Sequence, residues 1–170
     1  MKNVMLDLET MGTRPNAPVI SIGAVEFDAD RLGGRFYAAI DMVTSGGVPD
    51  MDTVRWWLCQ SNEAREAVTC GDRPLLSALA AFSNWFPEDA VVWGNGANFD
   101  NVILRETYLR EKELCPWSPF NDRCYRTVKS LFPAAPKPER AGTAHNAIAD
   151  AVFQAEHLIS INRFYDLGIL

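Results

Sequence analysis

The chain has 170 residues, of which 48% are hydrophobic and 22% are charged, and its formal net charge is −6. This length and composition predict one globular domain, and the acidic balance argues against a large phosphate-binding surface of clustered Lys and Arg. Because no stretch approaches the roughly 18 apolar residues of a membrane span and the first residues lack a secretory signal, we expect a soluble, cytoplasmic protein without membrane partners.

The four cysteines match no metal or disulfide pattern. Their separations of 11, 45 and 9 residues fit neither a zinc-knuckle spacing nor a dense disulfide framework. We therefore expect reduced, mostly structural thiols at Cys59, Cys70, Cys115 and Cys124.

The first half of the sequence predicts three strands and then helices. Alternating apolar residues and the hairpin-turn residues between them indicate strands at 3–9, 18–28 and 33–41. In the second strand, Gly23 would allow another segment to approach closely. Two helices are expected next, where capping residues precede good helix formers and apolar residues recur at helical intervals. They lie at 50–68 and 73–86.

The second half predicts one short apolar strand among further helices. The strand lies at 90–95, and Asn98 would cap the helix that follows it. Residues 123–132 indicate a strand end and a short helix, and the proline-rich segment 133–144 indicates a loop. The last helix, 145–164, is expected to bury a stripe of Ile148, Val152, Ala155 and Ile159. This order predicts an α/β fold, a mixed sheet covered by helices, with ligands gathered where strands end.

Two carboxylates lie at the end of the first predicted strand. Residues two apart on a strand point the same way, so Asp7 and Glu9 would stand a few ångströms apart and repel each other. Near a core, such a pair must raise a pKa or recruit a cation, and a hard divalent metal removes both penalties. The alternative is a solvated strand end, because Asp-x-Glu is a short and common sequence.

Three further residues complete the candidate set. Asp100 lies in the first turn of a predicted helix, where a negative charge is also favourable for the helix itself. If His145 lies on the preceding loop and Asn146 caps the last helix, Asp150 points from the first turns into the cleft, with the imidazole above it. The alternative for this pair is an exposed loop histidine and a solvated helix carboxylate.

The set as a whole suits phosphodiester hydrolysis. Asp7, Glu9, Asp100 and Asp150 are enough to hold two Mg²⁺ or Mn²⁺ ions about 4 Å apart, which clamp the attacking and leaving oxygens. An imidazole titrates near neutral pH, so His145 could accept a proton from a water molecule acidified by a cation. Residues 101–140 carry eight basic and five acidic side chains, a local charge of +3.

Three sequence motifs resemble those of a known enzyme family. DLET (7–10), NFD (98–100) and HNAIAD (145–150) are similar, in order and spacing, to the motifs of the DEDDh branch of the DnaQ-like, ribonuclease H-fold 3′→5′ exonucleases. Residues 6–28 and 51–58 further resemble the phage and bacterial group related to exonuclease VIII-type proteins and to the adenylate-preferring exoribonuclease RNase AS. The resemblance covers nearly all of the chain, so we expect one exonuclease domain over 1–170.

This resemblance implies a ribonuclease H-like mixed five-stranded sheet and a bacterial or phage-encoded enzyme. Its acids would bind two Mg²⁺ or Mn²⁺ ions, and His145 would be the general base. Water would attack the terminal phosphodiester of single-stranded RNA or a 3′ overhang and release nucleoside 5′-monophosphates. DNA is the alternative substrate, because no motif identifies a contact to the 2′-OH. Members of the family often form dimers, so a homodimer is compatible with the sequence.

Residues just after the first acids match the family segment that contacts the 3′-terminal nucleotide. They are Thr10, Met11 and Gly12. Gly12 would let the backbone approach the ligand, although an ordinary loop after a strand is the alternative. Trp57 or its neighbour Trp56 could stack a base, and packing in the core or in a subunit contact is the alternative.

Other functions fit less well. DLET also resembles the D-x-D-x-T start of haloacid dehalogenase-type phosphatases. That motif requires an Asp at position 9, where this chain has Glu, and the reaction leaves His145 without a role. The sequence GNGANF (94–99) follows a strand as a dinucleotide-binding loop does, but Phe99 replaces the third glycine and Asp100 would repel a pyrophosphate. A nucleic-acid-binding module without turnover would need a broken acid set, whereas all five positions are filled.

Overall fold

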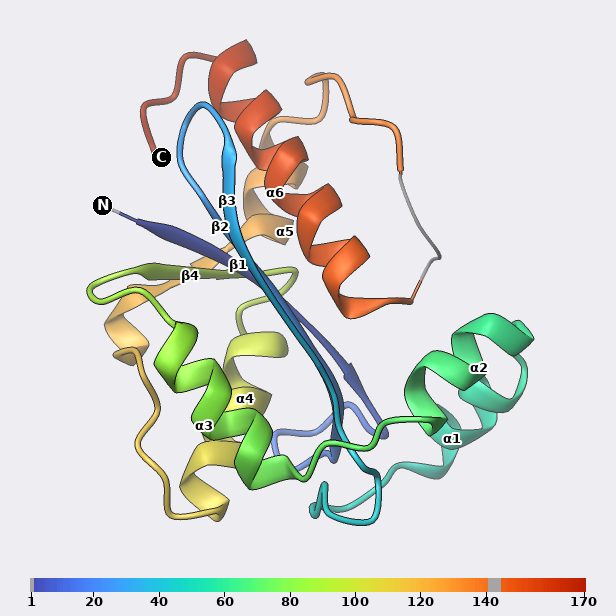
Figure 1. Cartoon of the computed structure of the whole chain (residues 1–170). Helices are drawn as coiled ribbons and strands as arrows, with labels where there is room; N and C mark the ends of the chain where they lie inside the picture. Colours follow the sequence, from blue (N-terminus) through green and yellow to red (C-terminus); the bar gives the residue numbers. More distant parts are fainter. Residues whose placement is uncertain (1, 141–144) are drawn as a thin grey trace.

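A five-stranded mixed sheet lies at the centre of the structure, a computed structural model that describes residues 2–140 and 145–170 (Figure 1). The strands are β1 (Asn3–Thr10), β2 (Val19–Phe27), β3 (Leu32–Ala39), β4 (Val91–Gly94) and β5 (Asp122–Cys124), in the spatial order β3-β2-β1-β4-β5. Strands β1 to β3 are antiparallel neighbours, whereas β4 runs parallel to β1 and β5 runs parallel to β4. The predicted mixed sheet of five strands is confirmed.

Helices cover both faces of this sheet. They are α1 (Met51–Leu58), α2 (Asn62–Thr69), α3 (Leu75–Trp85), α4 (Asp100–Arg110), α5 (Tyr125–Leu131) and α6 (Ala147–Phe164), with a short 3-10 turn at Pro119–Asn121. α3 and α4 pack on one face, and α5 and α6 pack on the other (Figure 1). α1 and α2 lie at one end, where Trp57 and Val68 share a small apolar cluster with Ile20 of β2.

The two sides of β1 have different roles because alternate side chains of a strand point to opposite faces. Leu6 and Leu8 belong to the core beneath α3 and α4, whereas Met5 belongs to the core beneath α5 and α6. Asp7 and Glu9 have the same parity as Met5. The two carboxylates are therefore on the face that α6 covers.

The close packing of α6 on the sheet depends on Gly23, which pairs with Asp7 across β1 and β2. A Cβ at position 23 would lie 2.2 Å from the carbonyl carbon of Ala147 and 2.3 Å from the backbone nitrogen of Ile148. Only glycine leaves room for the helix backbone at this distance. The close approach expected from the sequence is confirmed, and it brings the first turn of α6 against the middle of β1.

Two predictions about helix boundaries are wrong. The single helix expected over 50–68 is divided, because the hydroxyl of Ser61 accepts a hydrogen bond from the backbone N–H of Ala64 (3.2 Å) and starts α2 as a separate helix. Asn98 does not cap α4, which begins at Asp100 after Phe99 and has no side-chain cap.

The buried stripe of α6 agrees with the prediction at Ala155 and Ile159, which are buried in the core, and differs from it at Ile148 and Val152. Ile148 and Val152 are only half-buried, whereas Ala147, Ala151 and Ala155 are completely buried. Small residues occupy this stripe because the helix backbone approaches the sheet at Gly23, where larger side chains would not fit.

The remaining expectations have mixed outcomes. The loop predicted over 133–144 is confirmed for 133–140, which contains no helix or strand, and 141–144 lie outside the described residues. The cysteines are all free thiols, but Cys59 and Cys70 are exposed and so are not structural in the core. Within the described ranges, no helix has both the length and the apolar character that crossing a membrane requires.

Candidate active site

The four predicted metal-binding acids line one pocket. Asp7 and Glu9 come from β1, Asp100 is the first residue of α4, and Asp150 lies in the first turn of α6. Together with His145 they line a pocket of about 280 Å³. One oxygen from each of Asp7, Glu9 and Asp150 lies within 4.8 Å of the other two. Residues from three distant parts of the chain are thus brought together, as the sequence predicts.

Asp100 joins this group because β1 and β4 are parallel neighbours, whose carboxyl ends meet at the same edge of the sheet. Its Oδ1 accepts a hydrogen bond from the backbone N–H of Leu8 (3.2 Å). The helix can begin this close because residue 94 is a glycine, where a Cβ would lie 2.4 Å from Asn101 Oδ1 and 3.2 Å from Asp100 Oδ2.

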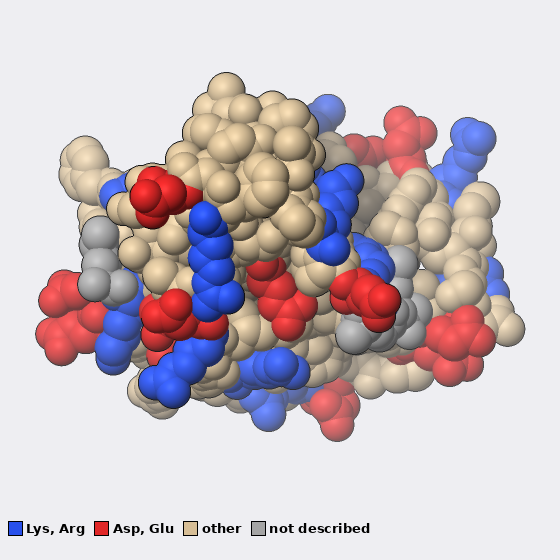
Figure 2. Space-filling view, turned by 90° about the horizontal axis from the view of Figure 1, so that it is seen from above, with Lys and Arg blue, Asp and Glu red and all other residues tan. Residues whose placement is uncertain are grey.

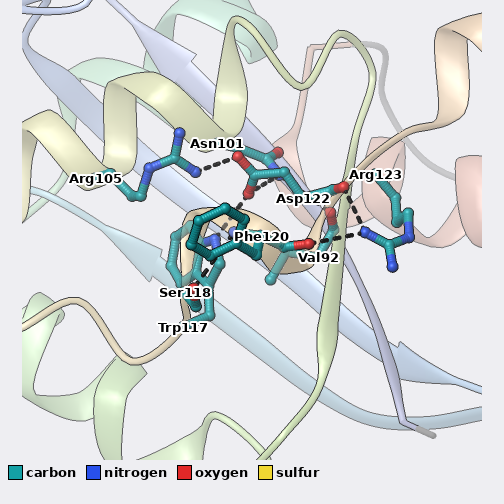
Figure 3. Close-up of polar contacts among 8 residues, drawn as sticks. All are labelled: Val92, Asn101, Arg105, Trp117, Ser118, Phe120, Asp122 and Arg123. Carbon is teal, nitrogen blue, oxygen red and sulfur yellow. Dashed lines mark hydrogen bonds and ion pairs between the residues drawn. The ribbon is translucent and has the colours of Figure 1, made fainter.

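A network of polar side chains fixes the first turn of α4 (Figure 3). Asp122, at the start of β5, accepts hydrogen bonds from Asn101 Nδ2 (2.8 Å) and Trp117 Nε1 (3.0 Å) and forms an ion pair with Arg105. The same Asn101 Nδ2 also donates to a carbonyl oxygen of β4 (3.0 Å). Because Asn101 directly follows Asp100, this network positions the Asp100 carboxylate.

The pKa values of Asp7, Glu9 and Asp100 are raised, so their negatively charged forms are disfavoured. Burial, with the nearby charges of Asp150 and Asp100, raises the pKa of Glu9 to about 8. Burial raises the pKa of Asp100 to about 7, although the Leu8 N–H hydrogen bond opposes this shift. The pKa of Asp7 is raised well above its ordinary value by burial and then by the charges of Asp100, Glu9 and Asp150. A cation bound between these carboxylates would therefore be favourable.

The donor atoms fit a hard divalent cation. Carboxylate oxygens are the ligands that Mg²⁺ and Mn²⁺ prefer, and the spacing among Asp7, Glu9 and Asp150 allows them to share an ion. Part of the negative charge is already balanced, because the guanidinium of Arg140 forms an ion pair with Asp150 Oδ1. Arg140 also lies over the ring of Phe153, 5.1 Å from its centroid, which keeps the guanidinium at the rim of the pocket.

His145 lies at the start of α6 beside Asp150. Its backbone N–H donates to Asp150 Oδ2 (3.1 Å), and the side chain of Asn146 caps the helix by accepting from Ala149 N (3.2 Å), as predicted. The imidazole contacts the ring of Trp56 edge-on at a centroid distance of 4.8 Å. The backbone φ of His145 is +62°, a left-handed conformation that non-glycine residues adopt uncommonly and that often marks a functional site.

A second cavity adjoins the acid pocket. It measures about 550 Å³ and shares Leu8, Glu9 and Phe99 with that pocket. The predicted substrate-contacting residues Thr10, Gly12 and Trp57 line it, and so do Thr13, Asp50, Thr53 and Trp56. The cavity therefore lies directly beside the acids.

The four predicted substrate-contacting residues differ in their surroundings. The Thr10 hydroxyl donates to Gly12 O (2.7 Å). Met11 does not line the cavity: its side chain is buried in the cluster of α1 and α2, and its backbone N–H already donates to Pro18 O (2.9 Å). Trp57 is only 4% exposed, and its Nε1 donates to Thr10 O (3.0 Å), which matches the core-packing alternative.

Two residues of the site, Gln154 and Arg140, carry no recognisable sequence signal, whereas Trp56 is one of the two tryptophans considered above for base stacking. Gln154 donates to Asp7 Oδ1 (2.6 Å), Arg140 pairs with Asp150, and Trp56 contacts His145 while remaining 42% exposed. Only the helical spacing of four between positions 150 and 154 could have indicated Gln154, because residues at i and i+4 share a helix face.

The described surface includes a face with mixed charge. In the view of Figure 2, Lys and Arg side chains are interspersed with Asp and Glu, and among the described residues drawn there no continuous basic surface forms. Near the acids, Arg126 and Arg140 are the basic side chains that line the pocket.

Sequence comparisons give one family and one distant relative. A model of the 3′-5′ exoribonuclease Rv2179c-like domain matches residues 2–162. An exodeoxyribonuclease of Enterobacteria phage T4 is 28% identical over 123 residues, which are 61% of this chain and 54% of that protein. The alignment thus spans about half the length of that curated relative.

Solved exonuclease structures share the fold. E. coli Exonuclease I in complex with a dT13 oligonucleotide has a TM-score of 0.70 at 14% identity, covering 97% of this chain and 42% of that one. The nuclease domain of 3′hExo, a DEDDh family member bound to rAMP, has a TM-score of 0.64 at 11% identity, covering 99% and 94%. At these identities the likeness concerns the fold alone, and it confirms the ribonuclease H-like sheet of the DEDDh exonucleases.

Proposed function

Because the chain belongs to the 3′-5′ exoribonuclease Rv2179c-like domain family, we propose that it is a metal-dependent 3′→5′ exonuclease. Its substrate is the 3′ end of single-stranded nucleic acid, RNA or a 3′ overhang, and its products are nucleoside 5′-monophosphates. The observation that carries the proposal is the convergence of Asp7, Glu9 and Asp150 within 4.8 Å, with Asp100 in the same pocket.

The four acids would hold two divalent cations, Mg²⁺ or Mn²⁺. Bound there, the ions would supply positive charge to the phosphodiester oxygens and acidify water. The protein's own part begins with Asp7, Glu9 and Asp150, which offer oxygens to a shared site. Asp100 completes the set from α4, where the backbone N–H of Leu8 holds one of its oxygens in place. Metal binding would offset the burial and the repulsion from Asp150 and Asp100 that raise the pKa of Glu9.

His145 would accept the proton from the attacking water. An imidazole suits this role because its ordinary pKa lies near neutrality. Its backbone N–H is fixed to Asp150, and its ring rests against Trp56, so the side chain is oriented by two independent contacts. Arg126 and Arg140, at the pocket rim, would interact with phosphate oxygens of the substrate.

The adjoining cavity would receive the terminal nucleoside. Thr10 and Gly12 offer backbone and hydroxyl contacts to a sugar, and the aromatic rings supply a stacking surface for a base. Of the two tryptophans, Trp56 has the exposed ring. Trp57 is buried, and its Nε1 donates a hydrogen bond to the backbone oxygen of Thr10. We expect a single-stranded 3′ end to enter this cavity of about 550 Å³.

Digestion of labelled oligonucleotides tests the activity. Single-stranded RNA, single-stranded DNA and duplexes with 3′ overhangs, each labelled at either end, are incubated with Mg²⁺ or Mn²⁺. We expect a ladder of 5′-labelled fragments that shortens one nucleotide at a time and mononucleotide release from the 3′-labelled set. Asp7→Asn and Asp150→Asn should each reduce turnover at least about a thousandfold, since both remove metal ligands.

A control variant tests whether the loss of activity is specific to the acids of the pocket. Asp30→Asn changes an acid that is 86% exposed and far from the pocket, so full activity is expected. Full turnover in Asp150→Asn, or digestion that proceeds equally in EDTA, would contradict the mechanism. Binding of oligonucleotides without any release of mononucleotides would support a binding module that lacks turnover.

DNA is the second candidate substrate. The relative from phage T4 is an exodeoxyribonuclease, and E. coli Exonuclease I was solved with a DNA oligonucleotide. The family description and the rAMP bound to 3′hExo support RNA. Matched RNA and DNA oligonucleotides of one sequence decide between them by the ratio of their kcat/KM values.

Four further properties complete the proposal. The protein is nearest to the exonuclease VIII-type and RNase AS-like group, and residues 1–170 act as one exonuclease domain. It works in the cytoplasm, where its four free thiols would stay reduced. A homodimer is the expected assembly if the exposed side chains of Met51 and Leu58 on α1 meet a second copy. Light scattering at two protein concentrations tests the dimer.

A further inference from the structure

The second turn of α6 carries a buried amide that has no role in the mechanism above. Gln154 lies one helical turn after Asp150, and its side chain lines the acid pocket. Its Nε2 donates to Asp7 Oδ1 over 2.6 Å. The residue is 5% exposed, and its Oε1 is buried without a hydrogen-bond partner among the described residues.

An unpaired buried amide oxygen is costly. Leaving such an acceptor without a donor destabilises the folded protein, whereas an apolar residue of similar size would avoid this cost. Two other buried side-chain atoms lack partners in the described part of the chain, Asn101 Oδ1 and Arg110 Nη1, but neither of these residues lines the acid pocket. The Gln154 oxygen alone among these three belongs to a residue beside the proposed metal ligands.

We propose that Gln154 is a positioning residue for the metal site, an inference that rests on the proposed function. Its N–H group holds Asp7 Oδ1, which leaves the other carboxylate oxygen of Asp7 for a divalent cation. Its Oε1 accepts a hydrogen bond from a water molecule that enters with the hydrated ion. Partners that orient a metal ligand in this way are worth about 10- to 100-fold in metal affinity.

Substitution by methionine tests the inference. Gln154→Met keeps the length and approximate volume of the side chain and removes both hydrogen-bonding groups. Mn²⁺ binding is measured without nucleic acid, from the electron paramagnetic resonance signal of free Mn²⁺, at pH 8 and again with a nucleoside 5′-monophosphate present. We expect the dissociation constant for Mn²⁺ to rise about 10- to 100-fold.

Asn162→Met provides a matched control. Asn162 lies on the same helix, is 7% exposed, and its Oδ1 accepts from Ile169 N (3.0 Å), so the variant loses a buried amide hydrogen bond away from the pocket. Its Mn²⁺ affinity should equal that of the unchanged protein. If Gln154→Met does not fold, Gln154→Asn keeps the amide but cannot span the distance to Asp7, and its affinity should fall in the same direction.

Turnover gives a second readout. In Gln154→Met the Mn²⁺ concentration for half-maximal activity should rise with the dissociation constant, the substrate KM should stay constant, and saturating Mn²⁺ should restore most of kcat. Normal Mn²⁺ affinity in both Gln154 variants would overturn this inference alone, provided that Asp150→Asn loses Mn²⁺. If the unchanged protein binds no Mn²⁺ in either titration, the proposed metal site and this inference fail together.

Discussion

Among single residues, Glu9 is a carboxyl group that the fold holds where its negative charge is unfavourable. Its pKa rises from an ordinary value of 4.5 to about 8, through burial and then the charges of Asp150 and Asp100. A group whose pKa is raised on folding stabilises the protein fully below its unfolded pKa, and that contribution is lost as the pH rises through the folded pKa. The sensitive window for Glu9 therefore extends from about pH 4.5 to about pH 8.

We expect the metal-free protein to lose stability across this window. Its melting temperature in EDTA should fall steadily between pH 5 and pH 8, by about 3 °C for each kcal/mol lost in a chain of this size. Mn²⁺ at pH 8 should restore most of the loss, because the cation stabilises the ionised carboxylates. Scanning calorimetry of Glu9→Gln should give a flatter profile, and a flat profile for the unchanged protein would contradict the buried acid cluster.

Arg140 competes with a cation for Asp150. The ion pair is partly exposed, with side-chain exposures of 43% and 12%, so it is worth about 1 kcal/mol. Arg140→Met should therefore tighten Mn²⁺ binding about fivefold in a titration without nucleic acid. The same variant should raise the KM for oligonucleotides, because a phosphate contact is lost. Weaker Mn²⁺ binding in this variant would argue against competition.

The sequence could predict the acids but not their neighbours. The period of two on a strand places Asp7 and Glu9 together, and a capping Asn146 places Asp150 in the first turn of its helix. Gln154 and Arg140 belong to no motif, and they reach the acids only through the packing of α6 on the sheet and the path of the loop before it.

At the level of secondary structure, the position of α6 depends on Gly23 of β2, which has no side chain. Gly23→Ala would force a Cβ of β2 to within 2.2 Å of the Ala147 carbonyl carbon, so α6 must move away from β2. We expect a loss of at least about 2 kcal/mol in stability and of most Mn²⁺ affinity, since Asp150 moves with the helix. Urea unfolding and Mn²⁺ titration measure the two effects.

Gly33→Ala is the matched control for that variant. Gly33 lies on the exposed edge strand β3, where a Cβ would come no closer than 3.2 Å to the side chain of Glu26. Its stability should change by less than about 1 kcal/mol, and its metal affinity should not change. Equal behaviour of the two alanine variants would show that the close contact between α6 and β2 does not matter.

The hydrogen bonds that Asp122 accepts and the ion pair that it forms give a second prediction at the level of secondary structure. Asp122→Ala leaves Asn101, Trp117 and Arg105 without their shared acceptor, and we expect a loss of about 2–3 kcal/mol in urea unfolding. Asp30→Ala removes an ion pair that is exposed on both sides and should change stability by less than about 0.5 kcal/mol. A comparable loss in both variants would contradict a special role for Asp122.

Helix boundaries were harder to predict than helix existence, for local reasons. The sequence indicates a helix after β4, but α4 begins through the fit of Asp100 against Gly94 and Leu8 and not through a capping side chain. The buried face of α6 was wrongly predicted only at Ile148 and Val152, because close approach to the sheet in the first turns favours alanine over large apolar residues. Both errors concern tertiary distances, which periodicity does not contain.

For the molecule as a whole, the net charge of −6 limits how nucleic acid can bind. Arg126 and Arg140 are the basic residues of the described acid pocket, so about two phosphates should be contacted. Each phosphate contributes a slope of about −0.7 to a plot of log affinity against log salt for single strands, which predicts a slope between about −1 and −2.

Fluorescence anisotropy of a labelled oligonucleotide measures this slope, with His145→Ala preventing turnover. Oligonucleotides of 4 and 20 nucleotides should bind with similar affinity, because only the terminal nucleotides are held. A slope steeper than about −4, or a large gain in affinity with length, would point to an extended binding surface instead.

The acids that meet at the pocket come from opposite ends of the chain, since Asp7 and Asp150 are 143 positions apart. During synthesis on the ribosome, the carboxylates of β1 and α4 emerge long before the last helix docks. A polypeptide that is only half synthesised therefore lacks Asp150 and does not have the complete set of acids. In this arrangement the complete set of acids exists only after α6 has been synthesised and has packed on the sheet.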